Sequence, residues 1–119
     1  MLTTIARILL GLIFVAGGVA GFLMTPPPMP GVAGKLTAGL HDSHWTLFVA
    51  FAQIVAGLLL LVNRYVPVAL IVIAAFLYNS FAFHLTTMPA TVPLPIVVTI
   101  LWLVVALRYR AVFAPIFRP

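Results

Sequence analysis

The stretch VPVALIVIAAFLYNSFAFHLTTM, residues 66–88, is an almost unbroken apolar run that nevertheless contains Asn79, Ser80 and His84. A helix needs about 20 apolar residues to cross the hydrocarbon core of a bilayer, and this run is long enough. Three further apolar runs occupy residues 2–24, 45–62 and 93–113. The repeated length indicates helices that cross a membrane, and it makes the polar residues inside them the first candidates for function.

Composition supports a membrane, rather than water, as the solvent of this chain. Hydrophobic residues make up 65% of the sequence and charged residues only 6%, whereas soluble domains carry about a quarter charged residues. So few charged groups could not cover the surface of a soluble domain. The net charge of +5 comes from scattered basic residues. We therefore expect it to reflect membrane orientation and contact with membrane lipids, and we predict no nucleic-acid binding.

The four runs predict an all-α protein in which residues 1–119 form a single membrane domain. We expect an antiparallel bundle of four transmembrane helices with a proline-rich outer loop at residues 25–44. Apolar side chains recur every four residues in the second half of this loop, which favours a short interfacial helix. Asp42 and Ser43 suit the cap of the helix that follows. The first run is longer than the apolar part of a typical signal peptide, so we expect it to span the membrane.

Basic residues predict the orientation of the bundle. In a four-crossing topology, Arg7, Arg64 and the arginines after residue 107 lie on one side of the membrane, and Lys35 lies on the other. Because basic residues are enriched on the cytoplasmic side, both termini are expected in the cytoplasm. The sequence thus predicts a multi-pass protein of the cytoplasmic (inner) membrane.

The first run carries a stripe of glycines. Gly11, Gly18 and Gly21 share one helical face with Arg7 and Phe14. In lipid, apolar contact alone does not drive helices together, so close approach through glycine is important. We expect this stripe to pack against another helix of the chain, and it also leaves open a homo-oligomer.

The polar residues of the second and third runs are predicted to lie in one region. The second and third runs are antiparallel helices joined at residues 64–65, so residues equally far from this turn lie at the same depth in the membrane. By this count, Gln53 lies within one helical turn of Asn79. We expect a ligand or partner pocket that opens toward the outer surface. The candidate residues are Gln53, Asn79, Ser80, His84, His44 and Trp45.

Other interpretations of these residues remain open. Gln53 and Asn79 are also suited to hydrogen bonding between neighbouring helices, a purely structural role. The three histidines and Asp42 lack the spacing of zinc ligands, so we predict no metal site. Because the chain has no cysteine, disulfides and thiolate sites are excluded.

Arg7 is a separate candidate site. The only acidic residue of the chain, Asp42, lies on the opposite side of the predicted bundle, so Arg7 has no carboxylate partner of its own. We expect its side chain to extend to the lipid headgroups. The alternative is that it binds an anionic lipid or a carboxylate of a partner protein.

Enzymatic catalysis is not favoured by the sequence. Paired carboxylates, a Ser-His-Asp set and a phosphate-binding loop are all missing. A small transporter or channel is less favoured still, because no acidic residue and no interrupted helix lies within the predicted spans.

Four segments together resemble a known family. They are ARILLGLIFVAGGVAGF (6–22), PPPMPG (26–31), AQIVAGLLLLVNRYVPVAL (52–70) and YNSFAFHL (78–85). In this order they resemble the DoxX family of small four-helix membrane proteins, and the resemblance covers most of the chain. It implies a non-catalytic scaffold or subunit of a membrane redox system, with a redox protein as partner and a quinone as the associated cofactor.

The predicted pocket offers an alternative function. In it, the pocket itself binds a small lipophilic ligand such as a quinone and takes a direct part in redox chemistry. The chain departs from the family at Gln53, where relatives often carry a glutamate. A neutral amide at this position argues against a mechanism that needs a proton carrier there.

Overall fold

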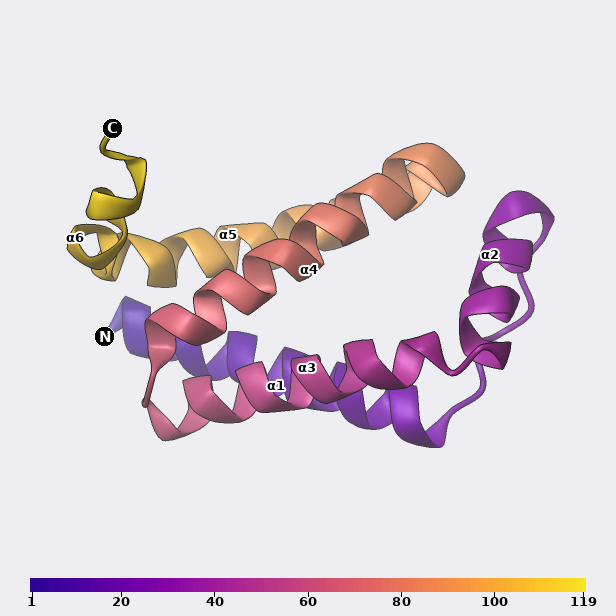
Figure 1. Ribbon diagram of the computed structural model, residues 1–119, viewed down its shortest axis with the longest axis horizontal. Coiled ribbons are helices and arrows are strands. Elements are labelled where there is room, and N and C mark those ends of the chain that lie inside the picture. Colours follow the sequence, from indigo (N-terminus) through magenta and orange to yellow (C-terminus); the bar gives the residue numbers. More distant parts are fainter.

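The computed structural model describes residues 1–119 and is helical throughout, without strands (Figure 1). The elements are, in chain order, α1 (Leu2–Leu23), α2 (Gly31–Asp42), α3 (Trp45–Val62), α4 (Val66–Thr87), η1 (Pro89–Thr91), α5 (Pro93–Arg108), α6 (Arg110–Phe113) and η2 (Ala114–Phe117).

Four helical segments are long and apolar enough to cross a membrane. They are α1, α3, α4 and the segment Pro89–Arg108, which joins η1 to α5. Large apolar side chains are exposed along all of them; Phe48 on α3, for example, is 79% exposed. Such an outer surface suits lipid as the surrounding solvent. The prediction of an all-helical protein with four apolar helices of membrane-spanning length is therefore confirmed, and these helices are compatible with an integral membrane protein.

Local backbone chemistry explains where α3 ends and α4 begins. Asn63 and Tyr65, on either side of Arg64, adopt left-handed conformations with φ of 57° and 53°. Two left-handed residues in three cannot continue a helix, so the chain reverses there. Pro67 then occupies the first turn of α4, where its missing N–H costs no hydrogen bond.

The last long helix ends earlier than the sequence suggested. A helix over residues 93–113 was expected, but α5 stops at Arg108 and a separate short helix, α6, follows. Tyr109 leaves the helical region with φ of −106° and ψ of 16°. Its N–H donates to the Ala106 carbonyl at 2.9 Å, three residues back, which tightens the last turn. The chain then bends away from α5 (Figure 1).

The outer connection contains more helix than one or two turns. Residues 24–30 are non-helical, and α2 then runs for 12 residues. The expected cap of α3 is partly wrong, because Asp42 is the last residue of α2. Ser43 instead accepts the Trp45 N–H on its Oγ at 3.4 Å and donates to the Leu40 carbonyl at 3.1 Å. His44 between them has φ of 65°, which turns the chain into α3.

α1 and α3 lie side by side and approach through their backbones (Figure 1). A Cβ added to Gly57 would lie 2.7 Å from the Gly11 carbonyl oxygen, and one added to Gly18 would lie 2.6 Å from the Ala50 carbonyl oxygen. No side chain fits into these spaces, so only glycine permits the contact. The prediction that the glycine stripe packs against another helix is confirmed, and we call this contact the α1–α3 seam.

α4 and α5 form a second pair. The Trp102 indole N–H on α5 donates to the Leu70 carbonyl on α4 at 2.9 Å. Between the two pairs lies a core of apolar side chains, in which the Phe14 and Phe76 rings meet edge to face at 5.1 Å. Edge-to-face aromatic contacts of this kind are favourable beyond the area that they bury. The core therefore joins α1 to α4 near the middle of the molecule.

The ends of the molecule differ. Both termini and the turn between α3 and α4 lie at one end, and α2 lies at the other (Figure 1). From the turn at Asn63–Tyr65, α4 diverges from α3 toward the end that carries α2. The candidate site is a cavity between these diverging helices, and it extends to α2.

Candidate functional site

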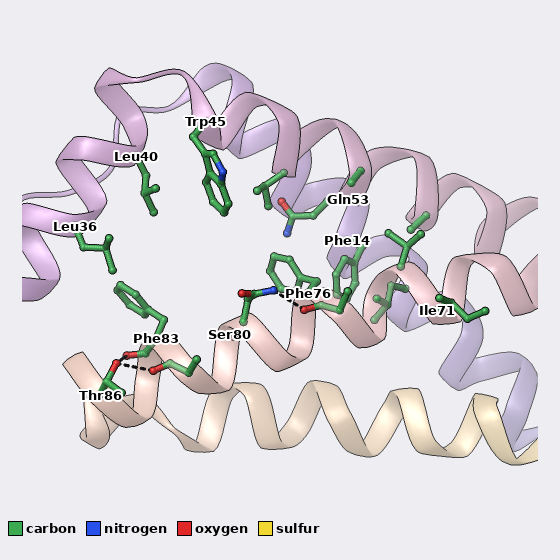
Figure 2. A pocket seen from close by; sticks show the side chains of 18 residues that line it. Phe14, Leu36, Leu40, Trp45, Gln53, Ile71, Phe76, Ser80, Phe83 and Thr86 are labelled. Atoms are coloured by element: carbon green, nitrogen blue, oxygen red, sulfur yellow. Dashed lines mark hydrogen bonds between the residues drawn. The ribbon is translucent and has the colours of Figure 1, made fainter. Parts of the chain in front are cut away.

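A large cavity of about 880 Å³ lies between α3 and α4 and extends to α2. Eighteen residues line it, and 14 of them are hydrophobic. Figure 2 shows Trp45 and Gln53 projecting from α3, Phe76 and Phe83 facing them from α4, and Leu36 and Leu40 at the α2 end. Ligand sites typically measure roughly 300–1,000 Å³ and combine an apolar lining with a few polar groups. This cavity has the size and chemistry of such a site.

Two of the four polar side chains in the large cavity are satisfied by their own helix. Asn79 Nδ2 donates to the Ala75 carbonyl at 2.9 Å, and Thr86 Oγ1 donates to the Ala82 carbonyl at 2.6 Å. The other two, Gln53 and Ser80, make no side-chain hydrogen bond within the chain and are accessible from the cavity. Polar groups in an apolar environment are favourable only with a hydrogen-bond partner. Gln53 and Ser80 are therefore the groups available to a ligand.

A smaller cavity of about 250 Å³ adjoins the first. It is lined by residues of α1, α4 and α5, and His84 lies in its wall. Four residues line both cavities and so form their boundary; they are Phe14, Gln53, Phe76 and Ser80. We call this set the junction. It combines two hydrogen-bonding side chains with two aromatic rings.

His84 is positioned by the turn that ends α4. Its Nδ1 is hydrogen-bonded to Thr91 Oγ1, and Thr91 Oγ1 donates to the Met88 carbonyl at 2.7 Å. These two bonds fix the orientation of the imidazole ring at the end of α4.

The residues predicted from the sequence fall into three groups. Gln53, Asn79, Ser80 and Trp45 line the large cavity, and His84 lines only the small one. His44 lines neither cavity and is exposed. His44 and His84 were expected in one pocket, but they do not line a common cavity, because α3 and α4 diverge toward this end.

Aromatic and α2 residues of the lining were not among the candidates from the sequence. Phe14 was assigned to helix packing, Leu36 and Leu40 to a surface helix and Phe83 to no role, yet all four line the large cavity. The four-residue spacing of Leu36 and Leu40 was a usable signal, since such a stripe must cover something apolar. Phe14 gave no such signal, because any core residue of α1 would look the same.

The structural alternative for Gln53 and Asn79 does not match the geometry. That interpretation requires hydrogen bonds between neighbouring helices, but Asn79 donates within α4 and Gln53 donates to no other helix. Metal ligation is not supported either. No group of three histidine, cysteine or acidic side chains lies close enough together to hold an ion.

Arg7 has a partner that the sequence search for carboxylates missed. Its guanidinium donates to the Leu60 carbonyl and, at 3.5 Å, to the Leu61 carbonyl. These groups belong to the last turn of α3, which carries the negative end of the helix dipole; the Leu60 carbonyl also accepts the Asn63 N–H at 3.2 Å. Arg7 thus closes one end of the α1–α3 seam, and its contact with lipid headgroups stays a prediction.

No protein-family model, curated protein or solved structure matches this chain. The proposed function of this protein therefore rests on its sequence and on the geometry of the two cavities.

Proposed function

We propose that this chain is a multi-pass integral membrane protein that binds a small lipophilic ligand between α3 and α4. The observation that carries the proposal is the large cavity, in which an apolar lining surrounds the unpartnered Gln53 amide and Ser80 hydroxyl. An apolar ligand body replaces lipid contacts along the walls, and a polar group on the ligand satisfies the two side chains. A purely structural cavity would have no use for polar groups without partners.

The proposed topology is an antiparallel four-helix bundle in the cytoplasmic membrane with both termini in the cytoplasm. The end that carries both termini and the α3–α4 turn also carries five of the six basic residues, whereas Lys35 lies on α2. The positive-inside bias supports this orientation. The proline-rich connection and α2 then form the outer side of the protein, and the large cavity opens toward that side.

We further propose a DoxX-like protein associated with a membrane redox system, with a quinone as the ligand class that best suits the cavity. A quinone has an apolar body and carbonyl oxygens that accept hydrogen bonds from an amide or hydroxyl. The protein itself need not catalyse a reaction, because the cavity contains no acidic residue or cysteine.

A scaffold or subunit role is the second candidate, and Tyr78 favours it. This residue lies about 18 Å along α4 from Val66, at 1.5 Å per residue, and its side chain is 77% exposed. A phenol hydroxyl directed at hydrocarbon gains a hydrogen bond if a helix of another protein, or of a second copy, packs against it. Co-purification of a partner from mild detergent that is lost with Tyr78→Phe would support this role; a strictly solitary protein would contradict it.

Native mass spectrometry of the intact protein released from its own membrane tests the ligand proposal. We expect a bound lipophilic molecule that survives release and is lost in Ala52→Phe, because Ala52 lines the large cavity. Val55→Phe is the matched control, since Val55 lies on the exposed face of the same helix. A protein without any adduct, or an adduct retained equally in both variants, would rule out the cavity as the binding site.

A further inference from the structure

The junction between the two cavities contains features that identify the ligand more closely. The inference developed from it depends on the proposed function, because it describes which part of a bound ligand lies where. Of all the residues that line either cavity, only Phe14, Gln53, Phe76 and Ser80 face both. A ligand that extends from one cavity into the other must pass these four side chains.

The two cavities differ in size, and the difference suits a ligand with a compact ring at one end, its head, and a long apolar chain, its tail. An engineered cavity of about 150 Å³ is known to hold benzene. The small cavity, at about 250 Å³, therefore has room for one six-membered ring with substituents but not for a long chain as well. The large cavity, at about 880 Å³ and mostly apolar, has room for an extended hydrocarbon tail.

The polar groups are placed for the head. The position of Gln53 depends on Gly17 of α1, because a Cβ at Gly17 would lie only 3.2 Å from Gln53 Nε2. The missing side chain gives the amide space between α1 and α4, and Figure 2 shows Gln53 extending from α3 toward Phe76. Its two N–H donors and the Ser80 hydroxyl can donate to an oxygen at the junction. His84 also lines the small cavity.

The aromatic members of the junction favour a flat head. Phe14 and Phe76 meet edge to face with an interplanar angle of 77°. Aromatic rings pack well against other flat rings, whereas a simple acyl chain would leave the Gln53 amide and the Ser80 hydroxyl without a partner. A lipid tail therefore fits the large cavity but not the junction.

We infer that the ligand carries a six-membered ring with at least one oxygen substituent and an apolar tail. The ring lies in the small cavity against Phe14 and Phe76, its oxygen accepts hydrogen bonds from Gln53 and Ser80, and the tail occupies the large cavity. This assigns the polar end of the ligand to the α1 side of the molecule and the tail to the side toward α2.

Trp45 provides a reporter for the test, because it lines the large cavity. In a Trp102→Phe background, Trp45 is the only tryptophan of the chain. The protein is placed in phosphatidylcholine nanodiscs and titrated with decyl-1,4-benzoquinone, and the saturable part of the fluorescence quenching gives a dissociation constant. Decylbenzene, which has the same tail and ring but no oxygen, is tested as a competitor.

We expect the dissociation constant of decylbenzene, obtained by competition, to be at least tenfold higher than that of the quinone. Gln53→Leu should weaken quinone binding about three- to tenfold, the effect of one hydrogen bond. Thr4→Leu is the control for replacing a polar side chain by leucine and should leave binding unchanged, because Thr4 is exposed and lines neither cavity. Circular dichroism and gel filtration verify that each variant is folded.

The outcomes separate this inference from the proposed function. If neither probe gives saturable binding, the proposed function is contradicted. If both bind equally and Gln53→Leu has no effect, the cavity binds lipophilic molecules and the assignment of the head is wrong. Equal weakening by Gln53→Leu and Thr4→Leu would also overturn the assignment, since the junction would then have no special role.

Discussion

The two contacts made by α3 differ in kind. On one side, the α1–α3 seam brings backbones together at Gly11, Gly18 and Gly57. On the other side, α3 and α4 diverge from their short turn and leave a cavity of about 880 Å³ between them. Thus α3 and α4, which are joined by only three residues, separate from each other. In contrast, α1 and α3, which are connected through the long outer segment, are in close contact.

The difference shows that residue size, rather than the length of the connection, sets the distance between helices in this protein. Small residues on both helices allow close approach, which replaces the hydrophobic driving force that is missing in lipid. Between α3 and α4, no comparable small-residue contact closes the gap, and larger side chains such as Phe76 and Phe83 line the cavity instead. A short turn fixes only the point from which two helices start.

The largest expected effect comes from adding bulk to the two sides of α3. Ala50→Leu should destabilise the protein by about 3 kcal/mol, because overpacking a tight contact forces backbones apart. Ala50 lies directly against the stripe: a Cβ on Gly21 would lie 2.8 Å from the Ala50 Cβ. Ala52→Leu adds the same atoms on the cavity side and should change stability by less than about 0.5 kcal/mol.

Unfolding in a graded series of sodium dodecyl sulfate, followed by circular dichroism, measures both variants. The proposed difference between the two sides of α3 is contradicted if Ala50→Leu is as stable as the unmodified protein. It also fails if Ala52→Leu is destabilised to the same extent, since the cavity would then be an occupied part of the core.

A smaller effect is expected at the end of the α1–α3 seam. Arg7→Leu removes the donor to the Leu60 and Leu61 carbonyls and should cost about 1 kcal/mol, the size of one interhelical hydrogen bond in a membrane. Arg64→Leu removes the same charge at the same end from an exposed position and should cost less. Unfolding midpoints in zwitterionic nanodiscs measure both. If Arg7→Leu matters only when anionic lipid is present, headgroup binding is the better account of Arg7.

The smallest effect tests whether α4 and α5 act as a pair. Trp102→Phe removes the hydrogen bond to the Leu70 carbonyl and should cost about 0.5–1 kcal/mol, because the remaining ring still fills the contact. Trp45→Phe is the control, since the Trp45 side chain makes no hydrogen bond to another helix and is 51% exposed. Equal loss of thermal stability in the two variants would show that the α4–α5 bond contributes nothing specific.

The sequence predicted the helices well because each is a long apolar run with a clear stop. Pro67 and Pro89 lie at the borders of α4, and the glycine stripe of α1 pointed to its contact with α3. The early end of α5 was not predictable in this way. Residues 109–113 contain four apolar or aromatic side chains beside Arg110, and the backbone bends at Tyr109 for reasons of local conformation that hydropathy does not record.

The candidate site was accessible to sequence reasoning only in part. Counting residues from the turn placed Gln53 beside Asn79 and Ser80, and these residues do line one cavity. The same counting failed for His44, because it assumes parallel helix axes and α4 diverges from α3. The binding role of these residues remains a prediction. The partner of Arg7 was missed because backbone carbonyls carry no sequence signature.

The bond between Arg7 and the end of α3 also has a consequence for biosynthesis. Arg7 and Leu60 are separated by 53 residues, which a ribosome adds in roughly 3–10 s. During that interval the arginine has no carbonyl to bind, so the nascent α1 has to hold it near the phosphates of the lipid surface. Insertion of α3 then supplies the carbonyls, so we expect the bond between Arg7 and α3 to form only once the second span is in place.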